Sequence, residues 1–168
     1  MKLDFGCGPN PKEGFEGVDI REFGGKVKHV LDLRGKWPWE DNSVDEAYSS
    51  HFIEHLEPQE RIHFANELYR VLKSKSTCTI ITPHWSSARA YGDLTHKWPP
   101  VSEFWLLYLN EEWRKNNAPH NDEYTCNFSF THGYTLHPTI AVRNIEFQQF
   151  AASFYKEAMQ DLIFTLIK

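Results

Sequence analysis

The sequence predicts a single α/β domain built on a doubly wound, mostly parallel sheet. Short β-branched or apolar runs alternate with turns in the first half of the chain, and an amphipathic helix precedes the last of these runs. A glycine-rich loop directly follows the first run. Because strands that alternate with crossovers form a parallel sheet, these observations define the fold class. The 168 residues suffice for one sizeable core, so we expect one domain over 1–168.

Turn residues and periodicity place the elements of the first half. Ile62, Leu68 and Leu72 fall at the 3.6-residue spacing of an amphipathic helix. Pro58 suits the first turn of that helix. The expected strands are 2–5, 16–20, 26–33, 44–51 and 76–83, and the expected helix is 57–72. Too few residues separate Gly8 from the second strand for a crossover helix, so we expect a shortened first crossover.

The second half is less regular and richer in aromatic residues. Cys126, Phe128 and Phe130 alternate as they would on one side of a half-buried strand. The expected helices are 101–114 and 140–155, and the expected strands are 125–132 and 161–168. The segment 84–100, rich in His, Trp, Ser and Pro, is expected to form a loop over the ligand-binding edge of the sheet.

Composition narrows the classes of function. A formal charge of −5 and a pI near 6.0 argue against extensive nucleic-acid contact. No apolar run is long enough to cross a bilayer, and the first residues already read as a strand, so we expect a cytoplasmic protein without membrane contact. The three cysteines are far apart and form no C-x-x-C pair, which predicts reduced thiols.

Acidic residues end three successive strands of the predicted sheet. These residues are Asp4, Asp19 and Asp32. The carboxyl ends of parallel strands meet at the edge where such sheets bind ligands. A carboxylate at position 19 can accept two hydrogen bonds from ribose hydroxyls, and Asp32 with Leu33 suits an adenine amine and ring face. Together these residues predict a nucleoside-binding site.

The loop "DFGCGPN" identifies the kind of nucleoside ligand. Gly6 and Gly8 allow the backbone to approach a ligand closely. The G-x-G-x-x-G pattern of dinucleotide folds is incomplete, because prolines follow the second glycine, and a Walker A lysine is missing as well. A ligand without phosphates, such as S-adenosylmethionine, therefore fits better than a nucleotide.

The first half of the chain resembles the class I S-adenosylmethionine-dependent methyltransferases. The resemblance lies in "LDFGCGPNPKEGFEGVDI" and "VLDLRGKWPWEDNSVDEAYSSHFIEHLE", and extends through "ELYRVLKSKSTCTIITPH". It implies a Rossmann-like methyltransferase fold, with 1–83 as the cofactor-binding half and 84–168 as the acceptor and lid half. It also implies which residues contact the cofactor. Asp4, Gly6 and Gly8 would hold the methionine moiety, Asp19 would bind the ribose, and Asp32 and Leu33 would frame the adenine. Ser49, Ser50 and His51 would line the pocket.

The chain departs from this family near the acceptor side. No helices precede the first strand, so a different lid must cover the substrate. The stretch "GDLTHKW" resembles a Gly-Asp-Pro-Thr-His segment of some members, with leucine in place of the proline. The candidate catalytic residues are His84, Asp93 and His96, since histidine titrates near neutral pH. Tyr91 and Trp98 are candidates to wall an acceptor pocket.

Three functions are compatible with the sequence. The first is methyl transfer from S-adenosylmethionine to a small-molecule or sugar-type O or N acceptor. The second, suggested by the short first crossover, is a non-catalytic S-adenosylmethionine-binding sensor or partner subunit. The third is a zinc peptidase, because "HFIEH" at 51–55 matches the H-x-x-E-H pattern of inverted zincins. That site needs His51 and His55 on one helical face. Since His51 is expected at a strand end, we expect no bound metal.

Overall fold

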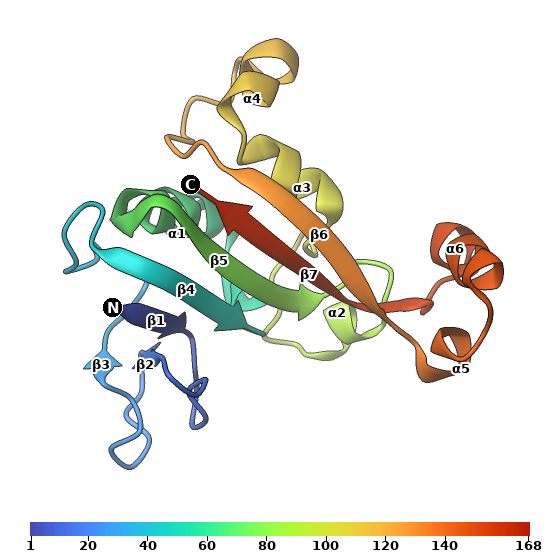
Figure 1. Ribbon diagram of the computed structural model, residues 1–168, viewed down its shortest axis with the longest axis horizontal. Helices are drawn as coiled ribbons and strands as arrows, with labels where there is room; N and C mark the ends of the chain where they lie inside the picture. The colour runs from blue at the N-terminus through green and yellow to red at the C-terminus, as the bar shows by residue number, and fades with distance from the viewer.

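The computed structural model describes residues 1–168 and contains one seven-stranded sheet in the order β3-β2-β1-β4-β5-β7-β6 (Figure 1). Neighbouring strands from β1 to β5 pair in parallel, whereas β7 is antiparallel to both of its neighbours. The strands are β1 Lys2–Phe5, β2 Glu16–Asp19, β3 His29–Val30, β4 Val44–Ser50, β5 Leu72–Pro83, β6 Ser129–Leu136 and β7 Met159–Ile167. The predicted fold class, a single domain with a mostly parallel sheet, is confirmed.

All of the helices follow β4 in the chain. They are the 3-10 helix η1 Ile53–His55, then α1 Pro58–Val71, α2 Arg89–Gly92, α3 Glu103–Tyr108, α4 Glu111–Asn117, α5 Pro138–Ala141 and α6 Ile145–Phe154. No helix lies in the β1–β2, β2–β3 or β3–β4 connection. The shortened first crossover is therefore confirmed, and the next two crossovers lack helices as well. None of the helices combines the length and the apolar character needed to cross a membrane.

The missing crossover helices leave one face of the sheet without a helical cover (Figure 1). Strand pairing places Tyr48, Thr79 and Thr165 side by side on this face, and all three are partly exposed. Ala47, Cys78 and other residues of opposite parity are buried on the other face. Threonine suits the open face, because it is β-branched and keeps a hydroxyl for water. The strand order is that of a doubly wound sheet, but helices cover only one of its two faces.

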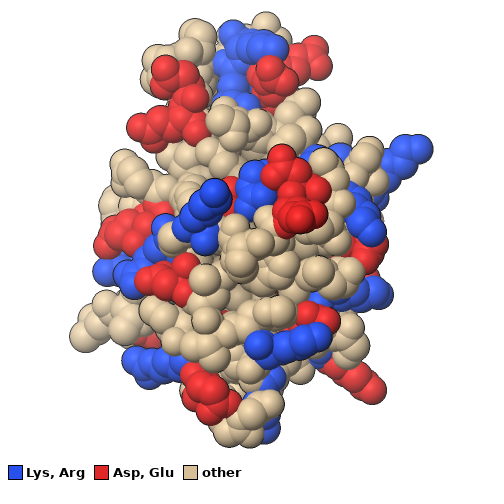
Figure 2. Space-filling view, turned by 90° about the vertical axis from the view of Figure 1, so that its left-hand side faces the viewer, with Lys and Arg blue, Asp and Glu red and all other residues tan.

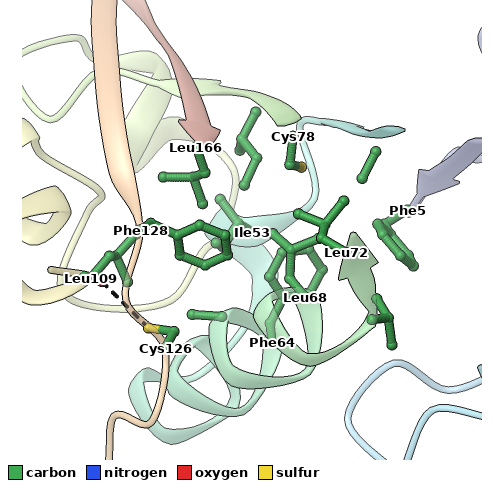
Figure 3. Packing of buried hydrophobic residues seen from close by; sticks show 14 of the residues in the cluster. Phe5, Ile53, Phe64, Leu68, Leu72, Cys78, Leu109, Cys126, Phe128 and Leu166 are labelled. Atoms are coloured by element: carbon green, nitrogen blue, oxygen red, sulfur yellow. Dashed lines mark hydrogen bonds between the residues drawn. The ribbon is translucent and has the colours of Figure 1, made fainter. Parts of the chain in front are cut away.

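The hydrophobic core lies between the covered face of the sheet and α1 (Figure 3). It contains 25 buried residues, and Phe5 of β1 packs against Trp37 and Phe64 with ring centroids 4.5 and 5.7 Å apart. Leu68 of α1 is fully buried beside them. Each such side chain contributes roughly 1.5–3 kcal/mol when removed from water. This core fixes the first strands, and with them the loops at their carboxyl ends.

The predicted helix 57–72 is confirmed as α1. Pro58 occupies its first position, and the backbone N–H of Glu57 donates to the carboxylate of Glu60 at 2.8 Å, which satisfies one free donor of the helix start. Phe64 and Leu68 lie on its buried face. The strand predicted at 26–33 is wrong in extent, since β3 has only two residues.

The two helices predicted in the second half are each broken. Residues 101–114 form α3 and α4, because Asn110 caps α4 by accepting from the Trp113 N–H at 2.9 Å. Residues 140–155 form α5 and α6, because Asn144 caps α6 in the same way with Phe147. Asparagine at an N-cap starts a new helix even where apolar spacing continues.

Two further predictions of the second half need correction. The strand predicted at 125–132 begins only at Ser129, because the Phe128 N–H donates to the Leu109 carbonyl instead of to a strand. Cys126 and Phe128 are nevertheless fully buried. The loop predicted at 84–100 contains one helical turn, α2.

Candidate functional site

A cavity of about 430 Å³ lies at the carboxyl ends of β2 and β3. It brings together Asp19, Asp32 and Leu33, as the sequence predicted. Ile20 and Phe52 add apolar surface that sequence reasoning missed. A carboxylate beside an apolar slot of this size matches a ribose and an adenine ring. On the face shown in Figure 2, acidic and basic side chains are interspersed without a continuous basic surface.

The glycine loop is tied to the edge of this cavity. Gly6 and Gly8 have positive φ values of 68° and 56°. The Gly8 N–H donates to the Asp19 carboxylate at 2.9 Å. A Cβ at Gly6 would overlap the ring of Phe52, whereas a Cβ at Gly8 would meet nothing within 4 Å. Gly6 is therefore required by close packing, and Gly8 faces open space beside the cavity.

The other predicted cofactor residues are more buried. Asp4 is 3% exposed, and burial raises the pKa of its carboxyl, partly opposed by a hydrogen bond from the Lys12 N–H at 2.8 Å. Ser49 is fully buried and donates to the Phe5 carbonyl at 2.9 Å, so it joins β4 to β1. The structure does not place Asp4, Ser49 or His51 on the wall of the 430 Å³ cavity. Their predicted contacts with the cofactor stay predictions.

Asp32 has a basic partner within the cavity wall. Both of its oxygens accept hydrogen bonds from Arg34, at 2.9 Å from Nε and 2.7 Å from Nη2. These bonds lower the pKa of Asp32 to about 2. The carboxylate is therefore ionised, and an adenine amine would share it with Arg34.

The "HFIEH" stretch forms a sharp turn after β4. His51 adopts a positive φ of 54°, and its N–H donates to the Ile81 carbonyl at 2.8 Å. Its Nδ1 lies 3.3 Å from Oε1 of the buried Glu54, and this carboxylate raises the pKa of the imidazole. The ring of His55 instead faces His96, with centroids 4.8 Å apart. His51 and His55 therefore do not form the shared face that the inverted zincin pattern requires.

The segment 84–100 is docked against this turn. The Lys97 N–H donates to the Glu54 carbonyl at 2.8 Å. Arg61 of α1 donates to the carbonyls of Lys97 at 3.0 Å and Pro99 at 2.6 Å. Arg61 is 5% exposed, and sequence reasoning missed it because its partners lie far along the chain. Within the segment, His96 lies beside Asp93, with Nε2 and Oδ2 3.9 Å apart.

His84, the third catalytic candidate, belongs to a separate cluster. Its Nδ1 accepts from the Ser86 N–H at 3.1 Å, so Nε2 carries the proton and donates to Glu103 at 3.2 Å. The side chain is fully buried. Tyr134 and Trp85 also donate to Glu103, at 2.9 and 3.1 Å. With both ring nitrogens engaged and no exposure, His84 is placed as a structural support rather than beside a substrate.

The Glu103 carboxylate of this cluster predicts how the stability of the fold changes at acid pH. Burial alone would raise its pKa, but hydrogen bonds from His84, its own backbone and Tyr134 outweigh burial and hold the pKa at about 2. A folded-state pKa below the ordinary 4.5 stabilises the fold above pH 4.5, and this contribution is lost as the pH falls towards 2. We expect Glu103→Gln to lower the free energy of unfolding at pH 7 by roughly 1–3 kcal/mol and to flatten its decline below pH 4.5.

Urea unfolding at pH 7 and pH 3 measures both effects. The matched control is Glu112→Gln, which changes an exposed glutamate of α4 without a hydrogen-bond partner. An unchanged pH profile in Glu103→Gln would show that the cluster does not depend on the carboxylate.

Aromatic side chains line two cavities beside the docked segment. One, of about 540 Å³, is formed by Trp85, Tyr91, Trp98 and Phe104 with neighbouring prolines. The other, of about 340 Å³, shares Trp85 and Tyr91 and adds Phe154 of α6. Tyr91 and Trp98 were the residues expected to wall an acceptor pocket, and the structure places both on one cavity. The helices α5 and α6 extend from this end of the sheet (Figure 1).

Comparison with known proteins gives one family match and many structural matches. Residues 19–80 match the model of a family described as "Methyltransferase domain". No curated protein matches the chain.

Three solved structures illustrate the structural likeness. A SAM dependent methyltransferase from Archaeoglobus fulgidus has a TM-score of 0.69 at 22% identity, covering 99% of this chain and 85% of its own. A possible histamine N-methyltransferase from Thermotoga maritima has a TM-score of 0.64 at 14% identity, covering 100% and 82%. A geranyl diphosphate C-methyltransferase from Streptomyces coelicolor A3(2) has a TM-score of 0.60 at 15% identity, covering 99% and 72%. At these identities the likeness shows the shared fold.

Proposed function

We propose that this chain is a class I S-adenosylmethionine-dependent methyltransferase that methylates an oxygen or nitrogen atom of a small-molecule or sugar-type acceptor. The match of residues 19–80 and the shared fold support the family, the enzyme class and the cofactor that the sequence predicted. The nature of the acceptor is the finer part of the proposal. It rests on the aromatic cavity beside the docked segment and not on the names of similar proteins, which include C- and N-methyltransferases.

The residues of the 430 Å³ cavity fit the cofactor. The Asp19 carboxylate uses one oxygen for the Gly8 N–H and the other for the Arg21 N–H, which leaves lone pairs for ribose hydroxyls. Ile20 and Leu33 offer apolar surface for the adenine. When bound, the cofactor supplies a methyl group on a positively charged sulfur, a reagent that needs alignment more than activation.

One observation links this cavity to an acceptor. Lys97 lines the cofactor cavity, and the next residue, Trp98, lines the 540 Å³ aromatic cavity. Consecutive residues of the docked segment therefore contribute to the two cavities. Flat aromatic walls suit a sugar ring or a small heterocycle. The exposed Trp85 and Tyr91 complete these walls.

The chain's contribution to the reaction is positioning. In the transfer, the acceptor oxygen or nitrogen would bond to the methyl carbon as the carbon–sulfur bond breaks, and the acceptor proton would leave to a base or to water. Holding donor and acceptor in line can account for up to about 7–11 kcal/mol of the barrier. The aromatic walls would hold the acceptor and exclude water, while Asp19 anchors the donor. Asp93 and His96 stay candidates for the group that receives the proton.

Transfer of labelled methyl groups tests the proposal. The chain is incubated with methyl-labelled S-adenosylmethionine and a panel of sugars, phenols and amines, and we expect label on at least one acceptor. Tyr91→Ala should then lower kcat/KM for that acceptor about 10-fold or more and leave cofactor affinity unchanged. Phe147→Ala, an aromatic of α6 outside both aromatic cavities, is the matched control.

The alternative outcome of this assay is equally informative. Cofactor binding without label on any acceptor would favour the non-catalytic sensor or partner subunit. Equal losses in Tyr91→Ala and Phe147→Ala would contradict the assigned acceptor cavity. A cytoplasmic location and the lack of membrane or nucleic-acid partners stay predictions from the sequence.

A further inference from the structure

Docking of the segment 84–100 assembles a cluster of Glu54, His55 and His96. One potential metal-ligand atom from each residue lies within 4.8 Å of the others. Glu54 and His55 come from the turn after β4, and His96 comes from "GDLTHKW". His96 lies 41 positions after His55 in the sequence, so only the fold brings it to Glu54 and His55.

The hydrogen bonds of His96 leave one nitrogen free. Its Nδ1 lies 3.3 Å from the carbonyl of Ala90, and a carbonyl can only accept, so Nδ1 carries the proton. The lone pair is therefore on Nε2. The nearest acidic atom, Oδ2 of Asp93, is 3.9 Å away and beyond hydrogen-bond length. Histidines that bind metals usually donate their other N–H to a carbonyl or carboxylate in this way.

His55 is oriented by a similar relay. Its Nδ1 lies 3.0 Å from Oγ1 of Thr95. The Thr95 hydroxyl donates its only proton to the Asp93 carboxylate at 2.7 Å, so it must accept from His55. The His55 lone pair is therefore also on Nε2. Asp93 thus sets the tautomer of a neighbouring histidine through one threonine.

Glu54 supplies a buried carboxylate oxygen that accepts no hydrogen bond. The residue is 4% exposed, and Thr82 donates to its Oε2 at 3.1 Å. Oε1 has no hydrogen-bond partner, and the basic group nearest to it is the His51 imidazole, whose Nδ1 lies 3.3 Å away. Buried Arg61 directs its donors to the Leu56, Lys97 and Pro99 carbonyls instead. An unpaired buried carboxylate is costly, and a cation would compensate for it.

We propose that Glu54, His55 and His96 bind one divalent transition-metal cation. Two neutral imidazole nitrogens and one carboxylate oxygen form a ligand set that suits zinc and other first-row metals better than magnesium. A metal about 2.1 Å from each ligand needs ligand separations of roughly 3.4 Å, so small side-chain rotations from the present separations would close the site. His51 is not a ligand, which distinguishes this site from the H-x-x-E-H pattern.

The position of the site gives the cation a role in activating the acceptor, and this role rests on the proposed function. His55 lines the cofactor cavity, and His96 lines a cavity of about 190 Å³ shared with Tyr91 and Trp98. Three protein ligands leave at least one coordination position open. An acceptor hydroxyl bound there would lose its proton more readily while the aromatic walls hold its ring.

Metal binding to the full chain tests the site without any activity assay. The protein is dialysed against chelator and titrated with Zn²⁺ by calorimetry, and with Co²⁺ by visible absorption. We expect one ion per chain and an affinity at least about 10-fold weaker in His55→Ala and in His96→Ala. His120→Ala, which removes an exposed histidine of no assigned role, should bind as the wild type does. Excess Mg²⁺ should not compete.

His51→Ala is the decisive variant. The proposed site predicts that this variant keeps its metal, whereas an H-x-x-E-H site would lose it. Loss of binding in His51→Ala, or wild-type binding no tighter than in His55→Ala and His96→Ala, would overturn the proposal. Circular dichroism confirms that each variant is folded, and His96→Ala alters a loop outside the core cluster. Metal binding without methyl transfer would leave this inference standing while rejecting the proposed function.

Discussion

Replacement of Asp19 by alanine is expected to lower the affinity for S-adenosylmethionine about 100-fold or more. Hydrogen bonds to a charged group contribute about 1.5–3 kcal/mol each, and the hydrogen bonds from two ribose hydroxyls would be lost together. Since 1.4 kcal/mol corresponds to a factor of ten, the loss of even one strong pair is measurable. Asp19 also accepts from the Gly8 N–H at 2.9 Å, so its loss loosens the glycine loop as well.

Calorimetric titration of Asp19→Ala and two further variants separates these effects. Asp19→Asn keeps an acceptor for the Gly8 N–H but removes the charge, so we expect a smaller loss of affinity. Asp122→Ala changes an exposed aspartate outside the cavity and should bind as the wild type does. Wild-type affinity in Asp19→Ala would contradict the assigned ribose contact.

Gly6→Ala is expected to destabilise the fold by roughly 2–5 kcal/mol. A new Cβ would overlap the ring of Phe52, and such overpacking costs about 1–3 kcal/mol. The positive φ of 68° adds about 1–2 kcal/mol for any residue with a Cβ. The loop would lose its native shape, and cofactor binding should weaken with it.

Gly8→Ala is the natural control for this prediction. It has a similar φ of 56° but an open environment, so only the backbone cost of about 1–2 kcal/mol is expected. Urea unfolding of both variants, and of Gly6→Ala combined with Phe52→Ala, isolates the steric part as a coupling energy. Equal destabilisation by Gly6→Ala and Gly8→Ala would show that Phe52 moves aside without cost.

The sequence could predict those structural features that depend only on residues close together in the chain. Asp19 and Asp32 follow strand-like runs, so their place at one edge of a parallel sheet follows from the fold class. The early helix was predictable because its apolar spacing is backed by Pro58 at the start. Asn110 and Asn144 were overlooked as helix caps, because apolar spacing continues across both breaks.

The arrangement of the acceptor side could not be predicted, because it depends on long-range docking. Arg61 donates hydrogen bonds to the carbonyls of Lys97 and Pro99, and these bonds determine which histidine side chains lie together. As a result His55 pairs with His96, while His84 is held by Glu103 in another cluster. Neither pairing has a signal in residue spacing. The helix-free face carries Thr79 and Thr165 side by side, and only the strand order assigns them to it.

A structure of the chain with the demethylated cofactor, S-adenosylhomocysteine, tests the central claim most directly. We expect the ribose hydroxyls on Asp19, the adenine against Ile20 and Leu33, and the sulfur directed along the docked segment towards Tyr91 and Trp98. A cofactor bound outside the cavity at β2 and β3, or a sulfur directed away from the aromatic cavity, would contradict this account.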